Sequence, residues 1–190
     1  MRKRTDIYKI VEAASTLPVS VADAKTHLRI THSTHDSLIS DLIWGAVKQF
    51  EKRANVCLST QRWRAFLDKG YEEIEIWKYP VTSIDLIQYY DTNNSIQTLS
   101  VNDYFSNVDS GSIGYMARPT VIDVEDVPSC YERDDAFIIT FTAGYYTIDY
   151  DVKQALLSWV YRKYENPNDA VTERISFFDN VVRDARSYGL

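Results

Sequence analysis

The side chains best suited to metal or acid–base chemistry in this sequence are three histidines near the N-terminus. His27, His32 and His35 lie within ten residues of one another, and Asp36 follows the last of them. Imidazole nitrogens and carboxylate oxygens are zinc ligands, and a bound metal could activate water for hydrolysis. However, this spacing places His27 on a predicted helix and the other two in the following link, which is no recognised ligand pattern. A metal-dependent hydrolase is therefore an alternative hypothesis, and we expect no metal site.

A second group of potential ligands is the acidic stretch at residues 123–135. It contains six carboxylates, Asp123, Glu125, Asp126, Glu132, Asp134 and Asp135. Carboxylates bind hard cations, but the stretch lacks the alternating D-x-D-x-D-G order and the terminal glutamate of a calcium loop. We therefore predict a solvated acidic loop.

Other catalytic motifs are missing from the sequence. Residues 110–114 read Ser-Gly-Ser-Ile-Gly, which is not the G-x-S-x-G elbow of hydrolases, and no phosphate-binding glycine motif occurs. Cys57 and Cys130 are isolated, so they indicate neither a disulfide framework nor a zinc site, and a reducing cytoplasm is the simplest environment. The sequence predicts no catalytic residue and no cofactor, and therefore no enzyme.

The predicted helices lie towards the two ends of the chain. Ser20 can cap a short helix that ends near residue 29 or 30, and a longer helix spans about 36–54, so that the two form an αα-hairpin. A third helix follows from Asp149 or Asp151 and stops at Asn166, before Pro167. A final helix is predicted at 173–188, with Ile175, Phe178 and Val182 on one side.

Short strands are predicted between the helix pairs, at residues 62–67, 74–77, 81–90, 96–99, 104–108 and 137–142. Residues 68–70 read as a hairpin loop between the first two, and residues 91–95 as the turn between the third and fourth. The apolar alternation at residues 7–11 could be a strand or an arm. Because no helical pattern separates the strands, we predict an α+β fold with a mainly antiparallel sheet.

Residues 136–166 connect the last strand to the third helix through Gly144. The helix carries a core stripe at Val152, Ala155, Leu156, Trp159 and Val160. We divide the chain into an N-terminal arm and αα-hairpin (1–58), a β-domain (59–148) and C-terminal helices that pack on the hairpin (149–190).

The composition limits the possible partners. The net charge of −6 argues against a protein that grips phosphates, and the sequence contains no signal peptide or membrane-spanning stretch. The 14 tyrosines slightly favour an interface-rich surface.

Five groups of motifs, in order, resemble the head–tail connector (adaptor) proteins of tailed double-stranded DNA bacteriophages. The first covers residues 18–30 and 35–39, including Pro-Val-Ser-Val-Ala-Asp-Ala, and the second covers residues 79–91, with Pro-Val-Thr-Ser-Ile and an aspartate-led turn. The others are Asn-Asp-Tyr at 102–104 with Gly-Ser-Ile at 111–113, Phe-Thr-Ala-Gly-Tyr at 141–145, and residues 152–157 with Tyr-Glu-Asn at 164–166. The acidic insert before Ala136 and the segment after Pro167 depart from the family pattern.

The resemblance implies a non-catalytic structural protein of the virion. The implied fold is a helical bundle, made of the N-terminal αα-hairpin and the C-terminal helices, with an inserted small antiparallel β-domain. The protein would be made in the host cytoplasm and assemble at the head–tail junction as a ring, which in this family is commonly a dodecamer. The ring would dock on the portal protein, meet a tail or stopper protein, and let DNA pass without specific binding or membrane contact. The alternative within this reading is a related tail or assembly protein at another joint.

Apolar side chains outside the predicted core stripes are the candidate interface residues. Those expected to meet a neighbouring subunit are Trp44, Leu157, Tyr161 and Tyr164, and those expected to meet the portal or the next component are Phe177 and Val181.

Overall fold

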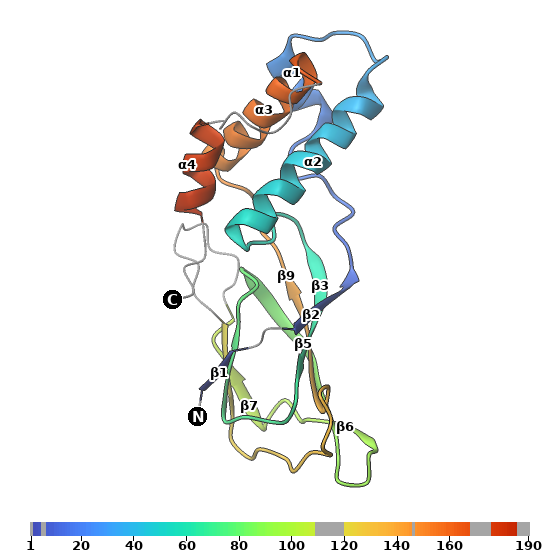
Figure 1. Ribbon diagram of the computed structural model, residues 1–190, viewed down its shortest axis with the longest axis vertical. Coiled ribbons are helices and arrows are strands. Elements are labelled where there is room, and N and C mark those ends of the chain that lie inside the picture. The colour runs from blue at the N-terminus through green and yellow to red at the C-terminus, as the bar shows by residue number, and fades with distance from the viewer. Residues whose placement is uncertain (1, 5–6, 109–119, 146, 168–175, 186–190) are drawn as a thin grey trace.

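The computed structural model describes residues 2–4, 7–108, 120–145, 147–167 and 176–185. Within these residues the chain forms four helices and nine strands. The molecule is elongated, with the helices at one end and the strands at the other (Figure 1). The predicted α+β class is confirmed.

The helical end contains α1 (Val21–Leu28), α2 (Asp36–Ala54), α3 (Tyr150–Glu165) and α4 (Ser176–Asp184). These helices share one apolar cluster, in which the rings of Phe50 and Phe178 meet edge to face with their centroids 5.7 Å apart. The predicted caps are present: the Asp23 backbone N–H donates to Ser20 Oγ over 3.0 Å, and Asp149 caps α3. The helices therefore begin where local capping chemistry allows.

The strands form two sheets. The first has the order β2 (Ile7–Glu12), β3 (Gln61–Leu67), β9 (Phe137–Ala143), β5 (Val81–Tyr90) and β6 (Ile96–Thr98), all antiparallel. The second has the order β1 (Arg2–Arg4), β4 (Glu73–Ile76), β8 (Thr120–Val124) and β7 (Tyr104–Ser106), and only its β1–β4 pair is parallel.

The two sheets share a second apolar cluster. Ile74 and Ile122 enter it from the four-stranded sheet, and Ala65, Phe137 and Phe141 enter it from the five-stranded sheet. Strand β4 alternates half-buried glutamates with buried isoleucines, which is the period-two pattern of a sheet with one buried face. The β-domain is thus a small sandwich.

Two strand predictions are wrong, and one ambiguous segment is settled. Residues 68–70 do not close a hairpin, because β3 and β4 belong to different sheets. Asp123, assigned to a loop, lies in β8, where Ile122 and Val124 are buried and Asp123 faces outward. Residues 7–12 are a strand, β2. Residues 109–112, whose sequence also favours a turn, lie outside the described residues, as do the parts of the predicted final helix at 173–175 and 186–188.

Three chain segments meet where the helical end borders the sandwich, and we call residues 55–61, 77–81 and 143–145 the junction. The N–H of Gly144 donates to the Pro80 carbonyl over 2.9 Å, and the N–H of Tyr145 donates to the Cys57 carbonyl over 3.2 Å. Gly144 has a φ of +139°, and a Cβ there would lie 2.3 Å from the Ser59 carbonyl oxygen. Only glycine fits this close backbone approach.

Glu51 secures the junction from the helical side. Its Oε1 accepts hydrogen bonds from the Leu58 backbone N–H at 2.7 Å and from Gln61 Nε2 at 2.8 Å. Burial raises the pKa of Glu51, whereas these two hydrogen bonds lower it. The effect of burial is larger, so the pKa lies above its usual value.

Candidate functional site

The histidines proposed as metal ligands pack against tyrosines of α3. His35 Nδ1 lies 2.5 Å from the hydroxyl oxygen of Tyr164, and the His27 ring meets the Tyr161 ring edge to face at 6.2 Å. The rings of His32 and His35 are 4.9 Å apart. The histidine cluster and the tyrosines on the flank of α3, which the sequence analysis treats separately, are therefore in contact.

In the described part of the chain, the histidine cluster included, no three His, Cys, Asp or Glu side chains are placed to hold a metal ion. Cys57 and Cys130 are free thiols. Burial, helped by the negative charge of Glu51, raises the pKa of Cys57 to about 12, so its thiol stays protonated and unreactive at neutral pH.

Two carboxylates of the β-domain loops serve turn structure. Asp91 accepts from the N–H groups of Asn93 and Ser95, which lowers its pKa and closes the β5–β6 turn. The hydrogen bond from Arg133 lowers the pKa of Asp135, and the Arg133 guanidinium lies 3.8 Å from the ring centroid of Tyr90. These residues therefore fix local conformation.

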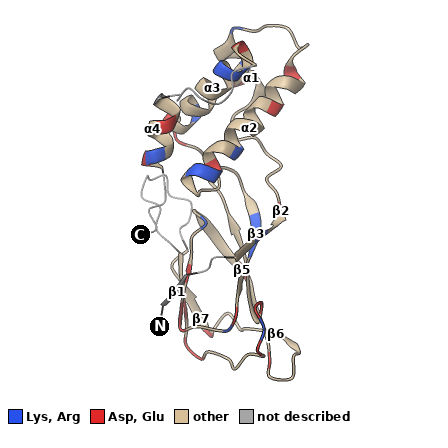
Figure 2. Cartoon of the chain, in the orientation of Figure 1, with Lys and Arg blue, Asp and Glu red and all other residues tan. Residues whose placement is uncertain are grey.

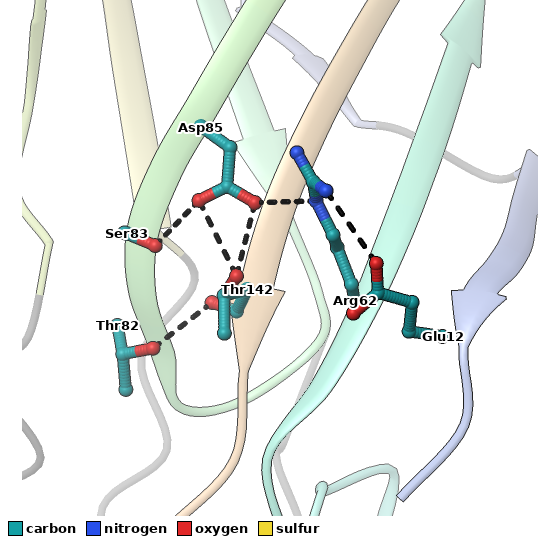
Figure 3. Close-up of polar contacts among 6 residues, drawn as sticks. All are labelled: Glu12, Arg62, Thr82, Ser83, Asp85 and Thr142. Atoms are coloured by element: carbon teal, nitrogen blue, oxygen red, sulfur yellow. Dashed lines mark hydrogen bonds and ion pairs between the residues drawn. The ribbon is translucent and has the colours of Figure 1, made fainter.

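A polar cluster that the sequence did not predict crosses the outer face of the five-stranded sheet (Figure 3). Asp85 on β5 accepts from Arg62 Nε at 2.9 Å, from Ser83 Oγ at 2.6 Å and from Thr142 Oγ1 at 3.0 Å. Arg62 also lies 3.6 Å from Glu12 Oε1, so the cluster links β2, β3, β9 and β5. Hydrogen bonds occupy the Asp85 carboxylate and no histidine or lysine lies within the cluster, so it holds strands together rather than activating a nucleophile.

Two hollows lie beside the junction, and Ala13 lines both. The first, of about 640 Å³, is lined mainly by hydroxyl and other polar side chains, among them Ser15, Thr60 and Thr142. The second, of about 830 Å³, lies between α2 and strands β2 and β3, and we call it the junction groove. Its charged lining residues are three lysines and two carboxylates, and its large apolar ones are two tryptophans and an isoleucine, namely Lys48, Lys52, Lys78, Asp41, Glu51, Trp44, Trp63 and Ile10.

The junction groove combines positive charge with aromatic surface. Lys78 Nζ lies 4.6 Å from the ring centroid of Trp63 and 5.7 Å from that of Tyr8, within the range of a cation–π contact. Lys48 and Lys52 are exposed and form no ion pair with any described residue. The groove is therefore suited to a group that carries carboxylates and an apolar anchor.

The predicted interface residues differ in accessibility. Tyr161 and Phe177 are 49% and 44% exposed, and Trp44 and Tyr164 are half-buried. Leu157 and Val181 are only 4% and 7% exposed, because both side chains pack in the helical cluster, and they have little surface to offer a partner. No helix in the described residues is long and apolar enough to cross a membrane.

Known proteins share this fold. The sequence profile described as phage gp6-like head-tail connector protein matches residues 18–134. A chain in the neck of an empty gene transfer agent (GTA) particle, computed with C6 symmetry, has a TM-score of 0.78 at 17% identity, with 97% of each chain covered. A chain in the virion of the native GTA particle has a TM-score of 0.76 at 18% identity, again with 97% of each chain covered.

A third structure, the neck of the native GTA particle computed with C12 symmetry, has a TM-score of 0.74 at 18% identity, with 97% of each chain covered. At this level of identity, the similarity to these structures demonstrates a shared fold. Comparison with curated proteins gives no match.

Proposed function

The chain belongs to the family of phage gp6-like head-tail connector proteins, and from this premise we propose that it is a structural protein of the virion neck. The match to the family profile over residues 18–134 is the observation that carries the proposal. The shared fold with chains of GTA necks and virions supports it.

We propose further that the protein forms a ring of twelve subunits that docks on the portal and extends the DNA channel toward the tail or stopper protein. The related neck structures were computed with C6 and C12 symmetry, which supports a ring. A net charge of −6 suits a channel component, because each neutralised phosphate would add affinity that resists sliding DNA. The role is architectural and requires no catalysis.

The two apolar clusters divide the chain into two structural parts. The helices of residues 1–58 and 149–190 form a bundle around one cluster, and residues 59–148 supply most of the sandwich around the other. Strands β1 and β2 extend the first segment into the two sheets. We propose that the bundle and the sandwich each contribute contacts in the ring.

The contact residues that we propose on the helices are the accessible members of the predicted set. Tyr161 and Tyr164 form a surface on α3, Trp44 lies in the junction groove, and Phe177 on α4 faces the portal or the next component. Leu157 and Val181 support these surfaces from inside the bundle.

Locating the chain in a virion map tests the proposal. We expect density for this fold in a ring between the portal and the tail. Its presence at a different joint would favour a related tail or assembly protein, and its absence from virions would overturn the structural role.

A pair of variants tests the α3 surface. Tyr161→Asp should prevent incorporation into the neck while the monomer stays folded, because the side chain is 49% exposed. Trp159→Asp should unfold the protein, because its ring packs against the bundle core and over Gly45. Circular dichroism and virion composition measure the two effects, and the reverse result would mean that the two faces are exchanged.

A further inference from the structure

The end of the sandwich farthest from the helices is strongly acidic. Four loop segments lie there, 68–72, 91–95, 99–103 and 125–136, and we call them the tip (Figures 1 and 2). Backbone hydrogen bonds link three of them: the N–H of Val124, at the end of β8, donates to the Glu72 carbonyl at 2.8 Å, and the N–H of Glu125 donates to the Asp103 carbonyl at 3.1 Å. They contain nine carboxylates against Lys69 and Arg133, so the rest of a chain with net charge −6 is close to neutral.

One side of the tip combines carboxylates with exposed apolar side chains. Phe105 on the edge strand β7 is 68% exposed, and Val101 is 74% exposed. Phe105 pairs with Asp123 across β7 and β8. We call this surface the tip patch, and it consists of Val101, Asp103, Phe105, Asp123, Glu125 and Asp126.

The tip patch lacks internal charge compensation. None of its four carboxylates forms a side-chain hydrogen bond or ion pair with any described residue. Exposed apolar side chains that are ringed by uncompensated charge mark a protein-contact surface. The carboxylates would repel DNA and anionic membranes, so the tip patch fits a protein surface that is basic and apolar.

The junction groove of the same chain has these two properties. Its three lysines outnumber its two carboxylates, Asp41 and Glu51, and Glu51 is engaged by Leu58 and Gln61. Lys48, Lys52 and Lys78 therefore match the carboxylates of the tip patch, and the groove tryptophans offer a surface for Phe105 and Val101. The groove is concave, and the tip patch lies at a projecting end of the molecule. The two surfaces are therefore complementary in charge, in polarity and in form.

We propose that the tip patch of one subunit docks in the junction groove of the next subunit, and this inference rests on the proposed ring function. A closed ring requires a heterologous interface, in which each subunit presents two different and complementary surfaces. The tip patch and the groove lie at different heights along the molecule, so the subunits are inclined to the ring axis. Trp44, a predicted interface residue, is part of this contact.

Complementary charge reversal tests the contact. The groove variant carries Lys48→Glu and Lys52→Glu, and the tip variant carries Glu125→Lys and Asp126→Lys. Each variant alone should be incorporated into virion necks about tenfold less than the wild type or lower, because like charges then meet across the interface. Supplied together, the two variants should restore incorporation, because each reversed surface finds a reversed partner.

A control variant reverses a charge elsewhere. Lys9 is exposed and lies outside the tip patch, the groove lining and the α3 surface, so Lys9→Glu should be incorporated normally. Circular dichroism of the purified variants confirms that each is folded.

The possible outcomes separate this inference from the proposed function. Normal incorporation of either single variant, or loss without rescue in the mixture, overturns the tip-to-groove contact, and the latter result would assign the groove to another neck protein. Absence of the wild-type chain from necks overturns the proposed function itself. Rescue by the mixture supports both.

Discussion

The helical end and the β-sandwich of this protein are built around separate apolar clusters that differ in how they are assembled. The helical cluster is built from helix faces. On α2, for example, Ile39, Ile43 and Phe50 lie on successive turns and form one buried face. The sandwich cluster joins Ala65, Ile122 and Phe141 from strands that are distant in sequence. A helix therefore creates its buried face before it packs, whereas the sandwich has a core only after its strands have paired.

The largest expected effects come from emptying each cluster in turn. Phe50→Ala and Phe141→Ala each remove a fully buried ring, and each should lower the free energy of unfolding by about 3–5 kcal/mol. Denaturant unfolding measures the loss. Hydrogen exchange should rise mainly in α2–α4 for the first variant and mainly in the sheets for the second.

Exchange that rises equally in both regions for each variant would contradict the comparison. It would mean that the helical end and the sandwich unfold as a single cooperative unit through the junction.

The next effect tests the junction. Gly144→Ala should cost roughly 3 kcal/mol, because the new Cβ would collide with the backbone of Ser59 at a positive φ. Thermal and denaturant unfolding measure this loss. Gly45→Ala is the matched control: its Cβ would meet only the Trp159 ring at 3.1 Å, and alanine gains up to about 1 kcal/mol of helix propensity.

The control should therefore stay within about 1 kcal/mol of the wild type. Similar losses for the two glycine variants would show that the backbone contact at Gly144 is not decisive.

The smallest expected effects concern the Glu51 carboxylate. Glu51→Ala should cost about 1–3 kcal/mol, because it removes the acceptor for the Leu58 N–H and the Gln61 amide. Glu51→Gln keeps an acceptor oxygen and should stay close to the wild type. Chemical denaturation at several pH values measures both.

The pH dependence has a defined sign. Burial raises the pKa of Glu51 in the folded state, so the neutral carboxyl is favoured there. Relative to Glu51→Gln, the wild type should lose stability as pH rises from the unfolded pKa through the raised folded pKa. An unchanged difference between the two proteins across that range would show that Glu51 titrates alike in both states.

The same contrast between local and long-range contacts explains which parts of the fold could be predicted from the sequence. The bounds of α2 follow from apolar spacing and match residues 36–54. Strand β8 was missed because it is short and runs into acidic residues, although its alternation of buried Ile122 and Val124 with outward Asp123 is a recognisable signal. The hairpin predicted at 68–70 is wrong because alternation identifies a buried face without identifying the partner strand.

The candidate surfaces were predictable only in part. Tyr161 and Phe177 were correctly placed outside the core, since their helical phase departs from the buried stripe. Leu157 and Val181 are buried because two neighbouring helices cover more of α3 and α4 than a single stripe. The junction groove collects Ile10, Lys48 and Lys78 from separate elements, so no local pattern in the sequence could indicate it.

The sequence by itself determined the helices, their caps, the glycine that turns the chain at 144, and the resemblance to head–tail connectors. These features depend on contacts between residues a few positions apart, or on short motifs that survive in order. Only the tertiary structure decided which strands share a sheet, and that carboxylates gather at the tip while three lysines gather in the junction groove. Those properties arise when the fold brings distant segments together, and the spacing of residues along the chain does not indicate which segments will meet.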